Sequence, residues 1–312
     1  MEMQPHEHER RPSPRTITPL STPTALGGMG LLRFPYHQND LRNLVRSALD
    51  EDEAFNDLTT IATVVSDRHA RGQLVARGEG VICGVPLAVE AFRQLDPKVT
   101  IRVDLEDGAR VRKGSNVLYL SGHARALLGA ERVALNYMQR LSGIATLTAK
   151  YVDAVKGTRA KILDTRKTTP GWRLLEKYAV RAGGGTNHRL NLSAAVLIKD
   201  NHLAAVDGDV ALAVRRARDL APVGTKIEVE CERIEQVEAA VEAKADIVMF
   251  DNMHPDEMAG CVQLVAGRAI TEASGRVRLE NVRAIAEAGV DWISVGSLTH
   301  SAPALDLALD FE

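Results

Sequence analysis

Cysteines and long apolar runs are both scarce in this 312-residue sequence. The three cysteines, Cys83, Cys231 and Cys261, are an odd number and lack CxxC spacing, which argues against a disulfide framework or a structural zinc site. No apolar run approaches the roughly 20 residues that a membrane span needs. A net charge of −2 gives no general reason to expect nucleic acid or membrane binding. We therefore expect a cytoplasmic protein whose partners include neither nucleic acid nor membrane.

Several catalytic and nucleotide-binding signatures are also missing. The sequence has no GxxxxGK(S/T) loop and no GxGxxG after a strand, so neither a P-loop nor a dinucleotide-binding fold is supported. It also has no HExxH motif and no GxSxG motif. Any chemistry must come from a different arrangement of side chains.

Positive charge is concentrated in the stretch from Asp164 to His202. This stretch holds seven Lys or Arg residues against three acids, 7 − 3 = +4, so that the rest of the chain sums to −6. A cationic segment in a mildly acidic protein usually faces an anion, although a solvated basic helix and loop is the alternative. Gly183–Gly185 lies inside the stretch, where glycine lets the backbone come close to a ligand.

Hydrophobic periodicity divides the chain into four parts. Residues 1–30 hold five of the twelve prolines and follow no helix or strand period, so we expect a disordered tail. Residues 31–150 combine helices with short strands and end in a helical pattern over 124–155, unbroken or broken near Ser142, that bridges two domains. Residues 301–312 are expected to pack back onto this N-terminal α+β domain.

The third part, residues 151–300, alternates apolar runs with helical segments. Six strands are expected, at Lys161–Leu163, Ala194–Ile198, Ile227–Val229, Ile247–Phe250, Arg268–Thr271 and Trp292–Val295. Helical patterns lie between most of them, at Val210–Leu220, Ile234–Ala243, Pro255–Val265 and Leu279–Ala288. Repeated βα units with short connections favour an α/β fold with a parallel sheet that closes into a barrel.

Polar residues follow each expected strand, at the end where α/β barrels build active sites. The first two strands are followed by cations and the next two by acids, whereas serine and glycine follow the last two. The residues are Asp164, Thr165, Arg166 and Lys167; Lys199, Asp200 and Asn201; Glu230; Asp251 and Asn252; Glu272, Ala273, Ser274 and Gly275; and Gly296, Ser297, Leu298, Thr299 and His300.

The cations at these strand ends can bind an anionic substrate. Arg166, Lys167, Arg189 and Lys199 suit carboxylates and phosphates, with about 1.5–3 kcal/mol for each charge-assisted hydrogen bond. His188, beside Arg189, is a further candidate for ligand contact. A desolvated Lys199 could instead form a Schiff base with a phosphorylated sugar, as in aldolases.

The acids and glycines predict the other half of a site. Glu230 and Asp251 are spaced like ligands for Mg²⁺, which takes one or two carboxylates plus substrate phosphate oxygens. Alternatively, they are ion-pair partners of the nearby cations. Ser274–Gly275 and Gly296–Ser297 follow the last strands, where barrels often bind phosphate through main-chain N–H groups.

Ten segments of the sequence resemble the quinolinate phosphoribosyltransferase family. Seven follow the order and spacing of that family: DTRKTTPGWR, AGGGTNHR, VLIKDNH, EVE, DNM, EASG and VGSLTHS. EDEAFNDLTT, CGVPLAVEAF and ERVALN also resemble it, so the similarity runs from about Leu41 to the C-terminus. The resemblance implies an α+β sandwich domain followed by an incomplete (β/α) barrel. It also implies transfer of phosphoribosyl from phosphoribosyl pyrophosphate to quinolinate with decarboxylation, giving nicotinate mononucleotide, CO₂ and pyrophosphate in NAD biosynthesis, with Mg²⁺ required.

The resemblance also implies roles for individual residues. The quinolinate pocket would be lined by Thr165, Arg166, Lys167, His188, Arg189 and Lys199. The Mg²⁺–ribose–pyrophosphate part would be bound by Glu230 and Asp251, with the metal held partly through water. The 5′-phosphate would be held by Ser274, Gly275, Gly296 and Ser297, and Arg276 and Val295 are further residues expected to bind substrate. The residues expected to be catalytic are Lys167, Lys199, Glu230 and Asp251.

Arg132, in the ERVALN segment, has two interpretations. From composition alone it is a surface helix cation paired with a nearby acid. The resemblance instead implies that Arg132 enters the quinolinate pocket of a partner subunit, in a homodimer or a larger homo-oligomer.

One departure from the family pattern lies after the fifth expected strand. The family commonly has Ser-Gly-Gly there, whereas this chain has Ser274-Gly275-Arg276. Arg276 either adds a cation to the phosphate end or points outward.

Three alternative functions remain on the sequence alone. One is a related phosphoribosyltransferase acting on another small pyridine or pyrimidine acid. Another is the Schiff-base aldolase that uses Lys199. The last is a barrel that only binds phosphorylated ligands, which predicts binding without release of CO₂.

Overall fold

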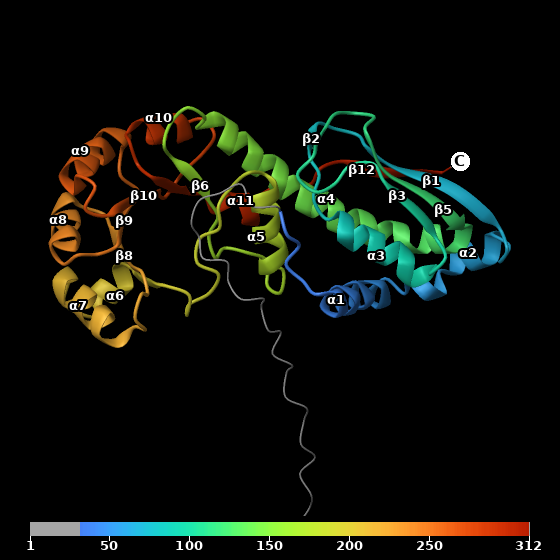
Figure 1. The fold of residues 1–312 in the computed structure, drawn as a ribbon, viewed down its shortest axis with the longest axis horizontal. Helices are drawn as coiled ribbons and strands as arrows, with labels where there is room; N and C mark the ends of the chain where they lie inside the picture. The colour runs from blue at the N-terminus through green and yellow to red at the C-terminus, as the bar shows by residue number, and fades with distance from the viewer. Residues whose placement is uncertain (1–31, 312) are drawn as a thin grey trace, which may run out of the picture.

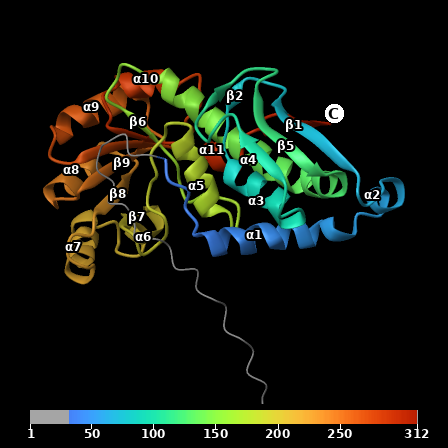
Figure 2. The ribbon, with the colours of Figure 1, turned by 45° about the vertical axis from the view of Figure 1, so that its right-hand side comes forward.

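The computed structural model of the chain describes residues 32–311, so the tail expected at 1–30 lies outside the described residues. The described chain forms two domains that lie side by side (Figure 1). Helix α4 (Ala124–Ala154) runs from one domain into the other, and the view turned by 45° shows the same arrangement (Figure 2). The expected fold class, an N-terminal α+β domain followed by an incomplete α/β barrel, is confirmed.

A four-stranded antiparallel sheet forms the centre of the N-terminal domain. Its order is β12 (Leu307–Phe311), β1 (His69–Ala76), β5 (Asn116–His123) and β3 (Thr100–Val103). The other elements of this half are α1 (Gln38–Glu51), η1 (Ala54–Asn56), α2 (Leu58–Thr63), α3 (Val85–Leu95) and the strand pair β2 (Gly80–Val81) and β4 (Arg110–Val111). Because β12 comes from the last residues described, the chain ends in the domain where it began.

Local sequence explains why the N-terminal helices form where they do. The apolar stripe of α1 buries Leu41, Val45 and Leu49 on one face, at the spacing of an amphipathic helix. Asp57 caps α2, because its carboxylate accepts a hydrogen bond from the Thr60 main-chain N–H at 3.1 Å. α3 has a proline in its first turn, where the missing N–H has no intrahelical partner to lose.

Helix α4 is a single unbroken helix through Ser142 and Gly143. The Ser142 hydroxyl accepts a hydrogen bond from the Cys83 N–H at 2.9 Å and donates one to the Cys83 carbonyl at 3.1 Å. A Cβ atom on Gly143 would lie 2.1 Å from the Pro303 carbonyl oxygen. The two small residues therefore let neighbouring backbone pack closely against α4 without interrupting it.

The C-terminal domain contains a six-stranded parallel sheet in the order β6-β11-β10-β9-β8-β7. Its strands are β6 (Lys161–Leu163), β7 (Val196–Ile198), β8 (Ile227–Cys231), β9 (Ile247–Asp251), β10 (Ile270–Ser274) and β11 (Trp292–Ser294). Its helices are α5 (Arg173–Ala182), α6 (Asp200–Ala204), α7 (Val210–Leu220), α8 (Ile234–Glu242), α9 (Pro255–Val265), α10 (Val282–Glu287) and α11 (Ser297–His300). β6 and β7 are the two edges, so the sheet curves toward a barrel without closing (Figure 1).

Strand boundaries in the barrel differ from expectation at three places that matter for function. β9 was expected to end at Phe250 but includes Asp251. β8 extends to Cys231, so Glu230 lies inside the strand rather than just beyond it. The fifth strand was expected at Arg268–Thr271, but β10 spans Ile270–Ser274 and includes Glu272. Acidic side chains on the inner face of a strand interrupt its apolar run, which explains why these strands end later than their apolar residues indicate.

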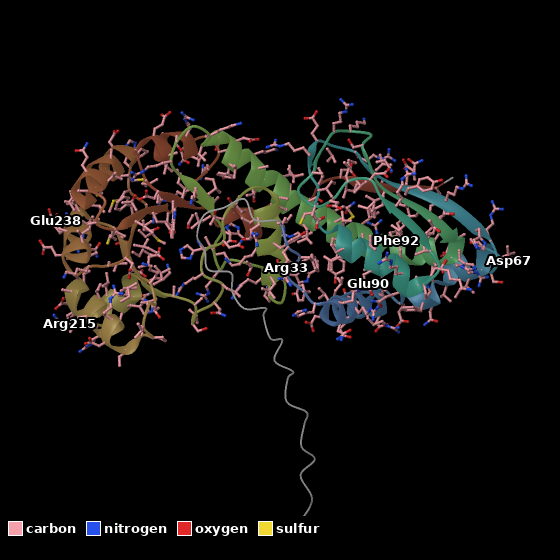
Figure 3. The ribbon with its side chains drawn as sticks, viewed as in Figure 1. Arg33, Asp67, Glu90, Phe92, Arg215 and Glu238 are labelled. Atoms are coloured by element: carbon pink, nitrogen blue, oxygen red, sulfur yellow. The ribbon has the colours of Figure 1, made fainter. Side chains whose placement is uncertain are left out.

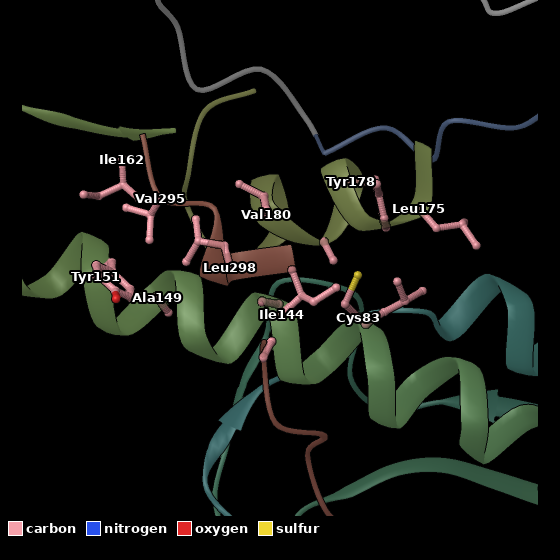
Figure 4. Packing of buried hydrophobic residues seen from close by; sticks show 14 of the residues in the cluster. Cys83, Ile144, Ala149, Tyr151, Ile162, Leu175, Tyr178, Val180, Val295 and Leu298 are labelled. Atoms are coloured by element: carbon pink, nitrogen blue, oxygen red, sulfur yellow. The ribbon is translucent and has the colours of Figure 1, made fainter. Parts of the chain in front are cut away.

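A continuous core joins the two domains along α4. Ile144, Ala149 and Tyr151 lie on the face of α4 toward α5 and the barrel, where Val180 and Leu298 meet them (Figure 4). On the outer helices of the barrel, charged side chains such as Arg215 on α7 and Glu238 on α8 point into solvent (Figure 3). The barrel mouth is thus fixed against α4, and its outside is an ordinary charged surface.

Candidate active site

The cationic stretch is partly neutralised by ion pairs of its own. Asp164, directly after β6, is fully buried and pairs with the ammonium of Lys177 on α5. The same carboxylate accepts hydrogen bonds from Asn187 Nδ2 at 2.6 Å and from the His188 N–H at 2.9 Å. Burial raises the pKa of Asp164 and lowers that of Lys177, and each partner's charge opposes the shift of the other. These charges organise the loop and do not face an anion.

A second buried ion pair ties the same segment to α4. Arg140 on α4 donates to Glu176 Oε1 on α5 at 2.7 Å, and Glu176 is fully buried. Glu176 also accepts from the main-chain N–H of Thr169 at 3.0 Å and from its hydroxyl at 2.9 Å. Arg140 donates as well to the carbonyl oxygens of Thr299 and Ala302. α4 therefore holds both the loop after β6 and the end of α11.

The Gly183–Gly185 turn packs against α4, contrary to the expectation that it approaches a ligand. A Cβ atom on Gly183 would lie 2.3 Å from the Ala145 carbonyl oxygen, and one on Gly185 would lie 2.8 Å from Thr148 Cγ2. Gly184 has φ +87°, a conformation that glycine adopts without strain. The glycines allow the chain to turn from α5 toward His188 in contact with α4.

Arg166 and Arg189 are close enough for their charges to interact, and neither forms an ion pair with a carboxylate among residues 32–311, although the charge of Glu228 also acts on Arg189. The Arg166 Nε atom is buried and has no hydrogen-bond partner there. Arg189 Nη1 donates to the Ala195 carbonyl at 2.9 Å, while burial and the charge of Arg166 lower the pKa of Arg189. Two close guanidinium groups repel each other, so this pair is arranged for an anion that binds between them or beside both.

Lys167 lies next to this pair on the same loop and is exposed. Its main-chain N–H donates to Thr165 Oγ1 at 3.0 Å, and its carbonyl accepts from Thr299 Oγ1 at 2.6 Å. A Cβ atom on Gly296 would lie 3.1 Å from Lys167 Cδ. The loop after β6 is thus in contact with the loop after β11, as expected for two neighbouring strands of one barrel mouth.

The acidic side of the site combines two adjacent strands. The Lys199 ammonium forms an ion pair with Glu230 Oε2, and Glu230 is 8% exposed. Asp251 ends β9 and accepts from Asn252 Nδ2 at 2.6 Å. In the β8–β9 register Glu230 pairs with Met249, so Asp251 follows two residues later on the same face. The two carboxylates share one edge, and the amine of Lys199 is held as an ammonium in an ion pair, which argues against a Schiff-base lysine.

His188 occupies a buried cluster that the sequence did not indicate. Its Nε2 atom lies 3.2 Å from Glu228 Oε2 on β8 and 3.4 Å from Glu272 Oε2 on β10. Neither contact is aligned well enough for a full hydrogen bond. Nδ1 accepts a hydrogen bond from the Arg189 main-chain N–H at 2.8 Å. Burial and the neighbouring charge of Glu272 raise the pKa of Glu228 to about 7.

Polar atoms that are buried without a partner gather at this site. In the part of the chain that the structure describes, five side-chain atoms have this status, and all but one belong to the barrel mouth. They are Asn116 Oδ1, Arg166 Nε, His188 Nε2, Glu228 Oε1 and Glu272 Oε2. Each unsatisfied buried group costs about 1–3 kcal/mol, so their concentration in one place indicates a functional constraint.

The phosphate end expected after β10 depends on one tight glycine. Gly275 has φ +83°, and a Cβ atom there would lie 2.4 Å from Asn252 Oδ1 and 2.8 Å from the Asn252 nitrogen. The next residue, Arg276, has φ +49° although it is not glycine, and its side chain is exposed. A non-glycine residue in this conformation is strained by about 1–2 kcal/mol, which glycine would avoid.

The expected residues after β11 divide into core and surface. Val295 is 1% exposed, and its N–H donates to the Leu163 carbonyl at 2.9 Å. Its side chain lies in the core beside α4 and Ile162 (Figure 4). Gly296 and Ser297 begin α11 and are half-buried at the barrel mouth. Among these residues, only the main chain and the Ser297 hydroxyl remain available to a ligand.

Arg132 lies apart from all the residues above. It is exposed on α4, and its side chain makes no hydrogen bond or ion pair with residues 32–311. It precedes Arg140, which contacts the barrel through Glu176, by eight residues, or about 12 Å along a helix. The structure does not bring Arg132 to the barrel mouth of its own chain.

The sequence interpretation missed three site-supporting residues, Glu228, Arg140 and Glu176, and it listed Glu272 at a strand end without giving it a role. A usable signal existed for the first of them. In Ile227–Glu230 the two acids are two residues apart within one strand, so both point to the same face of the sheet. The partners of Arg140 and Glu176 are distant in sequence, and no local pattern reveals them.

None of the helices among the described residues is both long and apolar enough to cross a membrane. Comparison with known proteins gives matches over most of the chain. The sequence pattern of the quinolinate phosphoribosyl transferase N-terminal domain matches residues 57–142, and that of the C-terminal domain matches residues 144–310.

Named relatives and a solved structure agree with these matches. The chain is 46% identical over 277 residues to the nicotinate-nucleotide pyrophosphorylase (carboxylating) of Mycobacterium leprae, covering 86% of this chain and 96% of that one. It is 44% identical over 270 residues to the probable enzyme of the same name from Bacillus subtilis, covering 86% and 93%. The structure of the nicotinate-nucleotide pyrophosphorylase from Francisella tularensis superimposes with a TM-score of 0.83 at 39% identity, covering 90% of this chain and 99% of that chain.

Proposed function

This chain belongs to the quinolinate phosphoribosyltransferase family, and on that basis we propose that it transfers phosphoribosyl from phosphoribosyl pyrophosphate to quinolinate with loss of CO₂. The products are nicotinate mononucleotide, pyrophosphate and CO₂, within NAD biosynthesis. The observation that supports this function best is the pair Arg166 and Arg189, whose like charges interact and which form no ion pair with a carboxylate among the described residues. Quinolinate is a planar dicarboxylate, and two guanidinium groups suit its two carboxylates.

In this proposal the cations fix the orientation of quinolinate. Arg166 and Arg189 hold its carboxylates, and Lys167 and Lys199 line the edge of the pocket, so that the ring nitrogen points at C1 of the ribose. The nitrogen forms a bond to that carbon while the bond from the carbon to the pyrophosphate oxygen breaks. The step needs no general base, because the nitrogen lone pair is already free. Positioning of this kind can supply about 7–11 kcal/mol of the barrier.

Decarboxylation then requires stabilisation of negative charge. The bond between C2 and its carboxylate carbon breaks, CO₂ leaves, and the electron pair stays at C2 until a proton joins it. The new pyridinium charge lies next to that carbon, and the surrounding cations of the pocket add to the stabilisation. A site built from fixed cations and without a nucleophile is suited to this sequence of events.

Mg²⁺ is the proposed cofactor, and Glu230 and Asp251 are the residues that would hold it, partly through water. Their carboxylate oxygens share one edge of the sheet and are the donor type that Mg²⁺ prefers. When bound, the ion neutralises the pyrophosphate leaving group. Ser274, Gly275 and the Gly296–Ser297 turn would receive the 5′-phosphate through main-chain N–H groups and hydroxyls.

The proposal extends to the assembly and the location. Arg132 is exposed, lacks a hydrogen bond or ion pair with the described residues, and lies away from its own barrel mouth. We infer that it completes the quinolinate pocket of a second subunit in a homodimer or a larger homo-oligomer. The three cysteines are free and buried, which supports a cytoplasmic location.

The function is tested with quinolinate labelled at its 2-carboxylate, incubated with phosphoribosyl pyrophosphate and Mg²⁺. We expect labelled CO₂ and nicotinate mononucleotide in equal amounts, and neither product after chelation of the metal. Nicotinate in place of quinolinate is the matched control, and its preferred use would refute the substrate assignment. Donor binding without CO₂ release would favour a barrel that only binds phosphorylated ligands.

The role of Glu230 has a separate test. In Glu230→Gln the KM for phosphoribosyl pyrophosphate should rise about ten-fold, more than the KM for quinolinate, because a carboxylate facing the metal–donor part is lost. Equal losses for both substrates would mean that Glu230 serves only to hold Lys199.

A further inference from the structure

Three side chains from separate elements meet below the barrel mouth, and we call them the His188 cluster: His188, Glu228 and Glu272. Glu228 and Glu272 come from β8 and β10, on either side of β9, and are 1% and 0% exposed. Glu272 is also held from behind by a hydrogen bond from the Ser294 hydroxyl on β11. Three strands of the sheet thus contribute to a contact with a histidine that belongs to none of them.

The contacts of the ring determine where its proton lies. The Arg189 main-chain N–H points at Nδ1 from 2.8 Å, which favours an unprotonated acceptor at Nδ1. Burial lowers the pKa of His188, but the carboxylates of Glu228 and Glu272 raise it to about 10, which favours the doubly protonated ring. The main-chain contact carries the greater weight, because it fixes the geometry at Nδ1. A proton on Nδ1 would face that N–H, donor against donor. Nε2 therefore carries the ring proton, between Glu228 Oε2 at 3.2 Å and Glu272 Oε2 at 3.4 Å.

The same three residues have the donor atoms of a metal site, within 4.8 Å of one another. The Arg189 N–H argues against that use. A metal ion on Nε2 would leave the neutral ring with its proton on Nδ1, where the Arg189 N–H already points. The contacts fit a histidine held by two carboxylates better than a histidine bound to a metal.

His188 is therefore fixed on four sides. Its N–H donates to Asp164 at 2.9 Å, and its carbonyl accepts from the Lys177 ammonium at 3.0 Å. At Nε2 its ring faces the carboxylates of Glu228 and Glu272 without a full hydrogen bond, and at Nδ1 it accepts from the Arg189 N–H. The one group in this chain of contacts that also belongs to the anion pocket is Arg189.

We propose that Glu228 and Glu272 are positioning residues for the dicarboxylate pocket: they hold His188 with its proton on Nε2, and Nδ1 in turn fixes the main chain of Arg189. This inference rests on the proposed function, because it assigns Arg189 to quinolinate. The two acids act only through His188 and Arg189, and they touch neither substrate. The carboxylates of Glu228 and Glu272 are buried without full hydrogen bonds, and in this proposal that arrangement directs the Arg189 guanidinium at an anion.

The first test needs no substrate, and it uses a variant protein only to assign one signal. Nitrogen-15 NMR of the full chain labelled in histidine reports which ring nitrogen carries the proton, and loss of one signal in His188→Gln identifies the residue. We expect an unprotonated Nδ1 and a protonated Nε2 in the wild type at pH 7. A proton on Nδ1, or movement of this signal on addition of Zn²⁺ or Mn²⁺ in the manner of direct coordination, would overturn the proposal.

The second test separates positioning from general support of the fold. Glu272→Gln preserves the size of the side chain. It replaces one carboxylate oxygen by an NH₂ group, a second donor that would face the proton on His188 Nε2. Quinolinate affinity, measured by calorimetry, should fall about ten-fold, while the affinity for phosphoribosyl pyrophosphate with Mg²⁺ stays within about two-fold. The matched control is Glu90→Gln, a buried glutamate on α3 in the other domain (Figure 3), which should change neither affinity.

The outcomes of the two tests remain distinguishable. Equal losses of both affinities in Glu272→Gln would show that Glu272 supports the fold and does not position Arg189. A wild-type protein that binds no quinolinate would refute the proposed function, while the NMR experiment would still report the ring proton of His188.

Discussion

The two domains bury different kinds of side chain. The N-terminal sheet packs residues such as Leu74 and Leu118 into its core, and only Glu90 and Asp96 are buried acids among the described residues of that domain. The barrel domain buries six acidic or lysine side chains: Asp164, Glu176, Lys177, Glu228, Glu230 and Glu272. One domain resembles an ordinary scaffold, and the other retains charge in its interior despite the cost of removing it from water.

The difference extends to how well those charges are satisfied. Asp96 accepts hydrogen bonds from the N–H and Nδ1 of His123, at 3.1 and 2.9 Å, and from the Lys98 N–H at 2.9 Å. Glu228 and Glu272 each keep one buried oxygen without a partner. In this protein, buried carboxylate oxygens without a hydrogen-bond partner distinguish the functional domain better than the number of buried acids does.

The largest expected effect concerns Arg132. A role for this residue in catalysis would mean that the N-terminal domain is more than a scaffold. Arg132→Ala should lower activity about 100-fold or more, since a misplaced substrate alone can cost that much. Arg46→Ala, an exposed arginine of α1 paired with Asp50, is the control and should have no effect.

Mixed dimers test whether Arg132 acts across subunits. Arg132→Ala and Arg166→Ala subunits are each inactive alone, yet half of the randomly formed dimers would contain one intact site of two. Activity should recover to about a quarter of the wild-type value, ½ × ½, if the sites are shared in a two-fold dimer. Verified mixed dimers without recovery would place Arg132 in its own subunit's site or outside catalysis.

The second effect compares how much stability is lost when a buried charge is disturbed in each domain. Lys177→Met leaves Asp164 buried without its cation, and breaking such a pair usually costs about 3–5 kcal/mol of unfolding free energy. Glu90→Gln in the scaffold domain should cost about 1 kcal/mol, because two glutamine side chains already contact that carboxylate. Urea unfolding followed by circular dichroism compares the midpoints. Similar midpoints for the two variants would mean that both substitutions lower the unfolding free energy equally, so that the two domains do not differ in this respect.

The third effect concerns acid stability of the scaffold domain. Although burial alone would raise it, the hydrogen bonds from His123 and Lys98 hold the pKa of Asp96 below its usual value of 3.8. A depressed carboxyl pKa means that its stabilisation is present above about pH 3.8 and is lost as the pH falls through the folded-state pKa. Asp96→Asn should therefore be about 1–2 kcal/mol less stable at pH 7, with the difference shrinking below pH 3.8. A difference that stays constant from pH 7 to pH 2 would contradict this account.

The smallest effect lies at the phosphate end of the barrel. Arg276→Gly should raise the unfolding free energy by about 0.5–1 kcal/mol, because glycine adopts φ +49° without strain. Arg278→Gly, two residues later and without a positive φ, should lower it instead. Thermal unfolding measures both. Loss of stability in Arg276→Gly would mean that the arginine side chain makes a contact worth more than the strain.

The sequence pattern predicted the bounds of those helices and strands that have one apolar run or stripe between turn residues. β6, α7 and α9 begin and end where expected, because each has a clear apolar run or stripe bounded by turn residues. β10 was misplaced by a few residues, since Glu272 and Ser274 on its inner face look like the start of a loop. A strand that lines a polar site does not show the apolar pattern on which strand prediction depends.

The roles of the expected cations stay a prediction. Arg189 lies close enough to Arg166 for their charges to interact, and Lys167, in the loop after β6, lies against Gly296. The +4 charge of the stretch overstated the anion site, because Lys177 is bound to Asp164 inside it. Partners such as Arg140 and Glu176 are set by the packing of α4 on α5, which composition and periodicity do not encode.

The pairing of β12 with β1 has a consequence for synthesis on the ribosome. The register joins Gly72 to Phe311 and Ala76 to Leu307. The N-terminal domain therefore lacks an edge strand of its sheet until Leu307–Phe311 have been translated. Until then, the N–H and C=O groups of β1 on that side remain open to water and to other nascent chains. The scaffold is completed after the barrel, although its sequence comes first.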